Sequence, residues 1–326
     1  MNITMKNLLT SISLEEIQSH NNMSVIPMFS NIEAKIDYLN LKKALETGLL
    51  EIKEVDEGGS VPDLLVINKG NMPVLLIDGE ELQGAKQNRV LNTSILLKEN
   101  SETKIPVSCT EAGRWEYRSR EFSDSGHFAH SELRAKKMRS VANSLNFTGE
   151  FRSNQSEVWD EISTKSEQMN FSSGTGAARD MYENFEGSVS DYIDAFPILA
   201  GQRGLFVFIN GKIAGFDYIS QEDTYLIVHQ KFVKSYTMEA IMSKSKDDKK
   251  PALDKVQQYL ESLQNVKEDR FDSVGYGYDY RYEGAESVGS SLIHQDEVIH
   301  SAFFKIESAT ENINMSDLKR RRSFRI

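Results

Sequence analysis

Short apolar runs separated by turn residues fill the first part of the chain. Apolar and β-branched residues form runs at 25–29, 64–67, 74–77, 90–97 and 105–108. Pairs such as Gly58-Gly59 punctuate these runs. Runs rich in β-branched residues and bounded by turn residues are typical of strands. The pattern therefore predicts a strand-rich part over residues 24–117, with one short helix over 39–45.

Apolar residues in the next part recur at helical spacing. This spacing predicts helices over 132–145 and 157–169. Side chains three and four positions apart lie on one face of an α-helix, so such a stripe packs against a core. A third helix is predicted from one more stripe, formed by Met181, Phe185, Val189, Tyr192 and Phe196. Residues 131–196 are thus expected to be helical, and the polar stretch 118–130 is expected to be a loop.

The last part, residues 204–306, mixes hairpins, helices and strands. Asn210-Gly211 lies between two apolar runs and is a strong hairpin signal, because both turn positions need a positive φ. A second hairpin is predicted at 295–297. Apolar stripes predict helices over 226–240 and 253–263, and strand-like sequence follows from 271 to 306.

These patterns together predict an α+β fold of mixed, mostly antiparallel sheets with packed helices, in two intimately associated subdomains. No linker rich in Pro, Gly or Ser divides the chain, so residues 1–313 are expected to form a single domain. Residues 314–326 are expected to form a basic, solvated tail, which carries the Lys-Arg-Arg-Arg run at 319–322.

Charge and cysteine content narrow the class of protein. The 326 residues carry a net charge of −11 and one cysteine. The negative balance disfavours non-specific nucleic-acid binding, which depends on neutralising phosphates. A single cysteine excludes an internal disulfide and fits a reducing compartment. With no secretory signal pattern and no apolar run long enough to cross a membrane, we expect a cytoplasmic protein without a membrane partner.

One segment places long polar side chains inside an apolar run. Residues 76–97 read LIDGEELQGAKQNRVLNTSILL. If this segment continues as one strand from position 85, Lys86, Asn88 and Asn92 share one face, and Gln87 and Arg89 share the other. Asn has a poor strand propensity, so two on one face need a reason to be there.

Two interpretations of this segment stay open. In the functional one, the strand end opens into a cleft, where Lys86 and Arg89 hold a phosphate or carboxylate and the two asparagines orient a ligand. Glu80 and Glu81 then serve as acid, base or acceptors from ribose hydroxyls. In the other, the segment is a solvated turn with an internal ion-pair network, which is the usual role of charge clusters.

A second segment, IPVSCTEAGRWEY at 105–117, adds further polar groups. Glu111 and Arg114 form a polar pair beside Trp115, whose ring offers a stacking surface. Cys109 has no basic neighbour in the sequence that would lower its pKa, so a buried structural thiol is favoured over a nucleophile.

These two segments resemble the signature of the ARG and rhodanese-phosphatase-superfamily-associated protein domain, in which ARG stands for ADP-ribosylglycohydrolase. The resemblance spans roughly residues 10–306. The matching positions are Glu80, Glu81, Gly84, Ala85, Lys86, Gln87, Asn88, Arg89, Asn92, Cys109, Glu111, Gly113, Arg114 and Trp115. The resemblance implies a role in ADP-ribose or NAD-derived nucleotide metabolism, in conflict or repair systems. It assigns no catalytic label to any of these residues.

Three further features each have two interpretations. The turn Ser-Ser-Gly-Thr-Gly at 172–176 precedes a helix and, with Thr175 and Arg179, is either an anion site or a plain helix start. Alternating Val274, Tyr276, Tyr278, Tyr280 and Tyr282 line either a stacking face or a half-buried strand covered by helices. His127 and His130 are too few for a zinc site, so no metal is expected.

The leading hypothesis is a protein that binds a small phosphorylated nucleoside ligand such as ADP-ribose, with hydrolysis of that ligand as an open question. No cofactor is expected. The candidate catalytic residues are Glu81, Glu80 and Glu111. The candidate ligand-binding residues are Lys86, Gln87, Asn88, Arg89, Asn92, Arg114, Trp115, Thr175 and Arg179. The alternative is a non-enzymatic ligand sensor or assembly module of a defence or repair system, with a homodimer as a further possibility.

Overall fold

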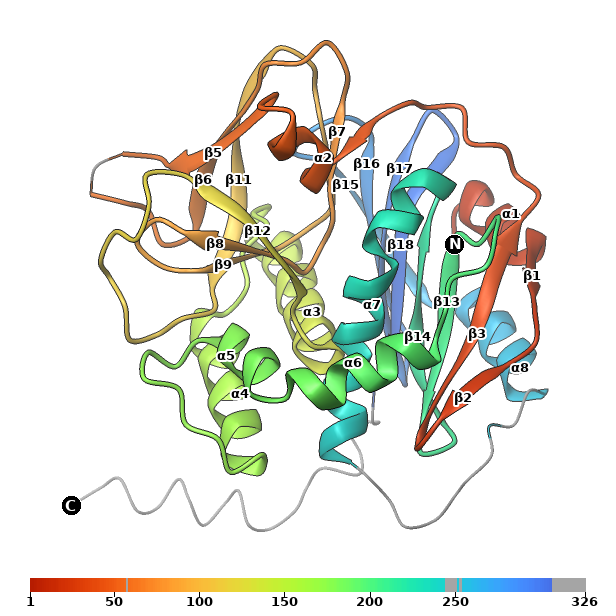
Figure 1. Cartoon of the computed structure of the whole chain (residues 1–326). Helices are drawn as coiled ribbons and strands as arrows, with labels where there is room; N and C mark the ends of the chain where they lie inside the picture. Colours follow the sequence, from red (N-terminus) through yellow and green to blue (C-terminus); the bar gives the residue numbers. More distant parts are fainter. Residues whose placement is uncertain (57, 244–250, 252–253, 307–326) are drawn as a thin grey trace.

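A nine-stranded antiparallel sheet supports the rest of the molecule and lies in the right-hand part of Figure 1. The computed structural model describes residues 1–56, 58–243, 251 and 254–306. The strand order is β1-β3-β13-β14-β18-β17-β16-β15, and β2 also pairs with β3. The strands are β1 (Ile12–Leu14), β2 (Gln18–His20), β3 (Met23–Ser30), β13 (Gly204–Ile209), β14 (Lys212–Ile219), β15 (Lys267–Asp272), β16 (Tyr278–Glu283), β17 (Ser287–His294) and β18 (Glu297–Lys305).

Helices cover both faces of this sheet. The helices α1 (Ile3–Ser11) and α8 (Asp254–Leu263) pack on one face, where Tyr280 and Tyr282 of β16 join their core. On the other face lie α3 (Ser131–Thr148) and α7 (Glu222–Met242). The α7 helix is buried nearly all round, since it also packs on β12 and on α6 (Glu186–Ala195). A helix in this position has to pack against the large sheet on one side and against β12 and α6 on the other.

A smaller β-rich lobe sits beside the α7 face and forms the upper left of Figure 1. It contains two sheets, with strand orders β12-β8-β9-β11-β6-β5 and β10-β7-β4, and its own apolar core beneath α2 (Leu41–Glu46). The strands are β4 (Leu39–Asn40), β5 (Leu50–Glu54), β6 (Asp63–Asn68), β7 (Val74–Leu76), β8 (Glu80–Gly84), β9 (Arg89–Leu91), β10 (Ile95–Leu97), β11 (Ser101–Cys109) and β12 (Phe122–Phe128). All sheet pairings except β4–β7 are antiparallel.

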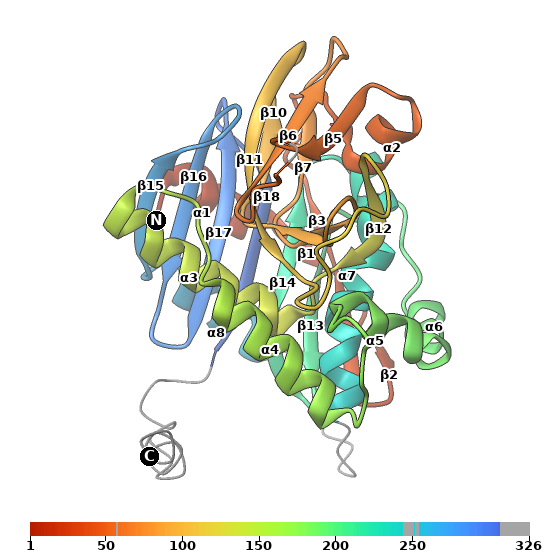
Figure 2. The ribbon, with the colours of Figure 1, turned by 90° about the vertical axis from the view of Figure 1, so that its left-hand side faces the viewer.

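Three further helices lie below the lobe in Figure 1, next to α7. They are α4 (Gln155–Gln168), α5 (Ala178–Asn184) and α6, and with α3 they share a fourth apolar cluster. Figure 2 shows α3 and α4 crossing the face of the molecule in succession. The predicted α+β class with mostly antiparallel sheets is confirmed.

Several local predictions are confirmed in detail. The Asn210-Gly211 pair forms the β13–β14 turn with φ values of 51° and 70°, and Gln295-Asp296 form the β17–β18 turn with φ values of 47° and 59°. The tyrosines of β16 form a strand covered by helices, in which Tyr280 and Tyr282 are buried and Tyr278 is 42% exposed.

Three predictions about secondary structure are wrong. The polar stretch 118–130 contains β12, because its backbone pairs with β8 although its side chains are polar. Residues 85–97 are not one strand, since a turn precedes β9 and a break separates β9 from β10. The third helix is two helices, which break at Phe185 (φ −108°, ψ 20°) between the poor helix formers Asn184 and Gly187. The predicted basic tail lies outside the described residues.

Buried charges join the lobe and α3 to the large sheet. Arg134 of α3 makes a two-pronged ion pair with Asp217 of β14, in which Nη1 donates to Oδ2 over 3.0 Å. The Tyr236 hydroxyl donates to the same carboxylate over 2.9 Å, and His300 Nε2 lies 3.7 Å from its other oxygen. The other ring nitrogen of His300 is 2.8 Å from the hydroxyl of Ser94, in the lobe.

A second group of buried charges extends this junction. Lys137 of α3 pairs with Asp78, in the lobe. Arg281 donates through Nε to Asp279 over 2.6 Å and through Nη2 to the hydroxyl of Thr93 over 2.8 Å. All five side chains are buried. The lobe is thus attached to the sheet by paired charges as well as by apolar packing.

Breaking this junction should be costly. Arg134→Met would leave Asp217 buried without its main counter-charge, so we expect the free energy of unfolding to fall by about 3–5 kcal/mol. Urea unfolding followed by circular dichroism measures this. The matched control is Lys267→Met, which removes an exposed partner of Asp269 and should leave the unfolding midpoint unchanged. Equal midpoints for the two variants would contradict the role given to Arg134.

Candidate functional site

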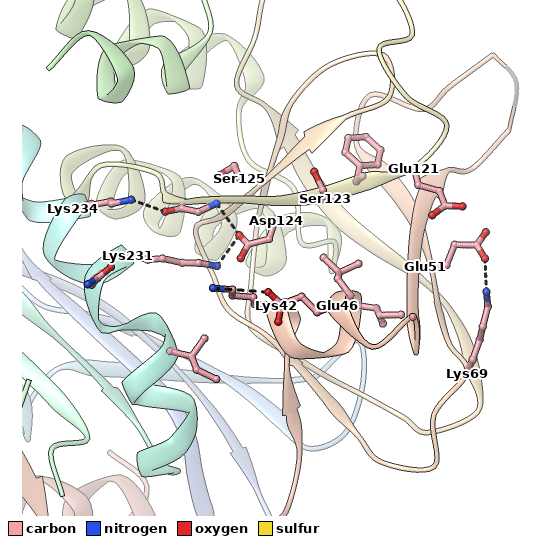
Figure 3. Close-up of a pocket in the computed structure, with 17 residues that line it drawn as sticks. Lys42, Glu46, Glu51, Lys69, Glu121, Ser123, Asp124, Ser125, Lys231 and Lys234 are labelled. Carbon is pink, nitrogen blue, oxygen red and sulfur yellow. Dashed lines mark hydrogen bonds and ion pairs between the residues drawn. The ribbon is translucent and has the colours of Figure 1, made fainter. Parts of the chain in front are cut away.

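A cavity of about 840 Å³ opens between α2, β12 and α7. Figure 3 shows the side chains that line it. Residues from α2, β5, β12, α7 and three loops converge there, because β12 pairs with β8 inside the lobe while α7 packs across β12 from the large sheet. The cavity therefore lies where the lobe meets the rest of the molecule.

Lysines and carboxylates alternate around this cavity. Lys42 lies 4.0 Å from Glu46, and Lys69 lies 2.8 Å from Glu51. Lys234 donates to the neutral carbonyl oxygen of Gly126 over 3.3 Å. Burial, and then the charge of the neighbouring Lys231, lower the pKa of Lys234. The walls thus offer both cations and hydrogen-bond acceptors.

Lys231 lies at the inner wall of the cavity between two carboxylates. Its Nζ donates to Asp124 over 2.7 Å and to Glu80 over 3.0 Å, and its side chain is 6% exposed. Burial acts to lower the pKa of Lys231, but the charges of Glu80 and Asp124 outweigh it and raise the pKa. Burial raises the pKa of Glu80, so this carboxyl group holds its proton more readily than an exposed one.

Glu81 points away from Glu80, because successive residues of a strand face opposite sides. It is 3% exposed, and the Thr110 hydroxyl donates to its Oε1 over 2.7 Å. Burial raises the pKa of Glu81 to about 7, against the opposing effect of hydrogen bonds from Thr110 and Ser125 and of the Arg179 charge. Ser125 also lines the cavity, whereas Glu81 itself does not.

The two cations predicted to bind phosphate are engaged within the lobe. Arg89 is fully buried, donates to Gln87 Oε1 over 3.0 Å and faces Glu54 at 3.6 Å. Lys86 donates to the carbonyl oxygen of Gly58 over 2.6 Å, and its Nζ lies 5.4 Å from the centre of the Trp115 ring. The cavity between α2, β12 and α7 is lined by neither Lys86 nor Arg89.

The remaining signature side chains also join one segment to another. Arg114 donates to Glu111 Oε2 through Nε (2.9 Å) and Nη2 (2.6 Å), and it reaches Asn88 Oδ1 at 3.2 Å. Although burial opposes it, hydrogen bonds from Arg114, Thr175 and the Asn88 backbone keep the pKa of Glu111 low. Asn92 accepts from the Ser108 hydroxyl (2.7 Å) and donates to the carbonyl oxygen of Phe151 (3.1 Å). The predicted contacts of these residues with a ligand stay predictions.

The turn at 172–176 packs directly on the signature. Gly113 donates its backbone N–H to the carbonyl oxygen of Thr175 over 2.7 Å, and a side chain at Gly113 would place its Cβ 2.9 Å from that oxygen. Arg179 pairs with Glu183 at 2.6 Å. Trp115, by contrast, is 47% exposed. The structure thus brings Thr175 and Arg179 to the signature, although they lie more than 60 residues along the chain from position 111.

The side chains that line the cavity were not predicted from the sequence. Lys231 and Lys234 belong to α7, whose apolar stripe was recognised, but buried lysines on its other side give no periodic signal. Asp124 and Ser125 lie in β12, whose polar sequence predicts a loop and not a strand. The composition of α7 gave no signal either, because its sequence contains polar and apolar residues in similar numbers.

Metal ligands, the one thiol and membrane-spanning helices can also be assessed in the described residues. Within residues 1–56, 58–243, 251 and 254–306, no group of three or more His, Cys, Asp or Glu side chains is arranged to hold a metal ion. Cys109 is fully buried, and burial raises the pKa of its thiol to about 11. Of the helices in these ranges, none is long and apolar enough to cross a membrane.

The fold and the cavity define an α+β protein in which a β-rich lobe closes over a polar pocket. A family model for the ARG and Rhodanese-Phosphatase-superfamily-associated Protein domain matches residues 11–304. The chain therefore belongs to this family, as its signature segments indicated. Comparisons with curated proteins and with solved structures give no match.

The raised pKa of Glu81 predicts how stability depends on pH. The pKa of this carboxyl group rises from its ordinary value to about 7 on folding, so the folded state binds the proton more tightly than the unfolded state does. The resulting contribution to stability is present at low pH and is lost as the pH rises from about 4.5 through 7. Between pH 5 and pH 8, the parent protein should lose about 2–3 kcal/mol more of its unfolding free energy than Glu81→Gln. Urea unfolding at both pH values measures the difference. The same pH dependence in both proteins would show that Glu81 titrates normally.

Proposed function

We propose that this protein binds a small phosphorylated nucleoside, of which ADP-ribose is the model compound, in the cavity between α2, β12 and α7. The observation that carries the proposal is the arrangement of four lysines around a cavity of about 840 Å³, one of them buried between Glu80 and Asp124. This volume falls in the range of small-molecule sites. The proposal transfers the phosphate-binding role from Lys86 and Arg89 to the lysines of α7.

The chemistry of the cavity fits both halves of such a ligand. Ammonium groups bind phosphate oxygens as point charges, and the hydrogen bond from the Lys234 ammonium to Gly126 goes to a neutral carbonyl oxygen and not to a carboxylate. Carboxylates accept hydrogen bonds from ribose hydroxyls, and Glu46, Glu51 and Asp124 line the same cavity. A wall with both kinds of group favours a ligand with phosphates and hydroxyls over a simple anion.

Family membership supports the same proposal at a coarser level. The description of the family associates it with the ARG and rhodanese-phosphatase superfamilies. The first of these links suggests ADP-ribose chemistry, and the second suggests phosphate chemistry. Both would need a site for a phosphorylated ligand, and the lysines around the cavity supply the charge for one.

Loss of Lys234 should weaken binding of the model compound. Lys234→Ala removes one phosphate contact, so we expect the Kd for ADP-ribose to rise roughly tenfold, with a smaller effect on adenosine, which has no phosphate. Isothermal titration calorimetry with the full chain measures both. The control is Lys212→Ala, in the β13–β14 hairpin. This hairpin contacts Ser243 at the end of α7, and Ser243 lies about 18 Å along the helix from Lys231. The proposal fails if the parent protein binds no phosphorylated nucleoside, or if both variants bind alike.

Hydrolysis of the ligand is a second candidate function, favoured by the raised pKa of Glu81. A carboxyl group that titrates near neutral pH can donate a proton to a leaving group, as hydrolysis at an anomeric carbon requires. Glu81 is linked to the cavity through Ser125, and Glu80 is linked to it through Lys231. Glu111, held ionised by Arg114, supports Glu81 by its charge.

The hydrolase hypothesis and the ligand-sensor hypothesis predict different behaviour of the Glu81→Gln variant. If the protein is a hydrolase, this variant should bind ADP-ribose with nearly unchanged affinity but release no adenine from it, because Gln cannot supply a proton to the leaving group as water adds to the anomeric carbon. Chromatography of the reaction mixture measures product, and calorimetry measures binding. Binding by the parent without any product would favour the non-enzymatic ligand sensor instead.

A further inference from the structure

A second cavity lies on the opposite face of the large sheet from α7. It measures about 470 Å³ and lies between α1, the loop before β4 and the end of the β17–β18 hairpin. Leu8, Ile32, Tyr218 and Val298 at its walls belong to the apolar core on the α1 face, whereas the α7 face has a separate core. This cavity is therefore separate from the proposed nucleoside site.

The charge of this cavity has one sign. Three acidic residues line it, Glu33, Asp296 and Glu297, and its lining contains no Lys, Arg or His. Glu33 and Asp296 are exposed, whereas Glu297 is 4% exposed. A polar pocket with three carboxylates attracts a cation and repels the phosphates that the other cavity suits.

Glu297 uses only one of its two oxygens in the described structure. Its Oε2 accepts from the backbone N–H groups of Lys35 (2.7 Å) and Ile36 (3.2 Å), which fixes the loop over the cavity. Its Oε1 is buried and has no hydrogen-bond partner among the described residues. A buried carboxylate oxygen without a donor is costly, so a ligand that donates a hydrogen bond to it would gain binding energy.

The rest of the wall specifies the kind of cation. Ile3, Leu8, Ile32 and Val298 surround the carboxylates with apolar surface, which a hydrated inorganic ion does not use. The three acidic side chains are also not placed together as metal ligands, since no such group occurs among the described residues. A primary ammonium group on a short apolar arm satisfies both the carboxylate and the apolar wall.

We propose that this cavity binds a small organic cation, with the ammonium group donating to Glu297 and the apolar arm packed between α1 and Val298. The ligand class is a primary amine with a hydrocarbon or aromatic body. This inference does not depend on the proposed nucleoside site, because the two cavities share no lining residue.

The test compares three probes that share a phenyl ring and differ in the charge and type of the polar group. The probes are 2-phenylethylamine, 2-phenylethanol and phenylacetate, titrated into the full chain at pH 7 and followed by ligand-observed NMR. We expect the amine to bind at least roughly tenfold more tightly than the alcohol, because only the ammonium pairs with Glu297, and the carboxylate not to bind. Equal affinity of the amine and the alcohol would overturn the proposal, as would binding of calcium chloride at the same site in place of the amine.

Two variants separate the site from general effects on folding. Glu297→Gln keeps the size of the side chain but removes its charge, and should reduce amine binding roughly tenfold. Ala34→Phe places a ring at the exposed cavity edge and leaves the Glu297 side chain itself unaltered, so it should block the amine even if Glu297→Gln disturbs the loop. Lys234→Ala, in the other cavity, is the control and should bind the amine as the parent does. Folded variants at positions 34 and 297 that both bind the amine like the parent would refute the assignment.

Discussion

The buried carboxylate of Asp217 is the point on which the arrangement of the molecule depends. It receives the guanidinium of Arg134 from α3, the hydroxyl of Tyr236 from α7 and the ring of His300 from β18. Burial alone would raise the pKa of Asp217, but Arg134 and His300 overcome that effect and lower it. A charge of this kind is tolerated in a core only with its partners in place, so it fixes α3 and α7 against the sheet.

The same constraint positions the proposed ligand site. Tyr236 and Lys231 belong to one helix, so the contact that holds α7 on the large sheet also sets where Lys231 and Lys234 meet β12. The lobe is fixed to the same frame through Ser94 and Asp78, which lie in the signature segment. The signature therefore has an evident structural role: its polar side chains join strands, loops and the large sheet into one frame around the cavity.

Much of the fold could be predicted from the sequence because local patterns determine it. Asn210-Gly211 fixed a hairpin through its backbone preferences, and the apolar stripes indicated α3, α4, α7 and α8. The polar strand β12 could not be found this way, because its place in a sheet comes from pairing with β8 and not from its own side chains. Family membership was also recognisable, since the signature is a long contiguous pattern.

The candidate site was harder to predict for a related reason. Long polar side chains in an apolar segment indicate that something satisfies them, but the sequence does not say whether a ligand or the protein does so. For Arg89 and Arg114 the structure shows protein partners, Gln87, Glu54 and Glu111. The cavity residues come from α2, β12 and α7, which are far apart along the chain and meet only in the folded state.

The large sheet does not close on itself, so it has two edge strands. The sequence and length of these strands affect whether molecules associate in concentrated solution. At one margin, β15 has the sequence KEDRFD, with Lys267 and Asp269 paired across its surface. At the other, β1 is only three residues long. Charged or very short border strands are poor templates for the backbone of a neighbouring molecule. The protein can therefore keep both edges of this sheet unpaired without joining other copies through its backbone into extended aggregates.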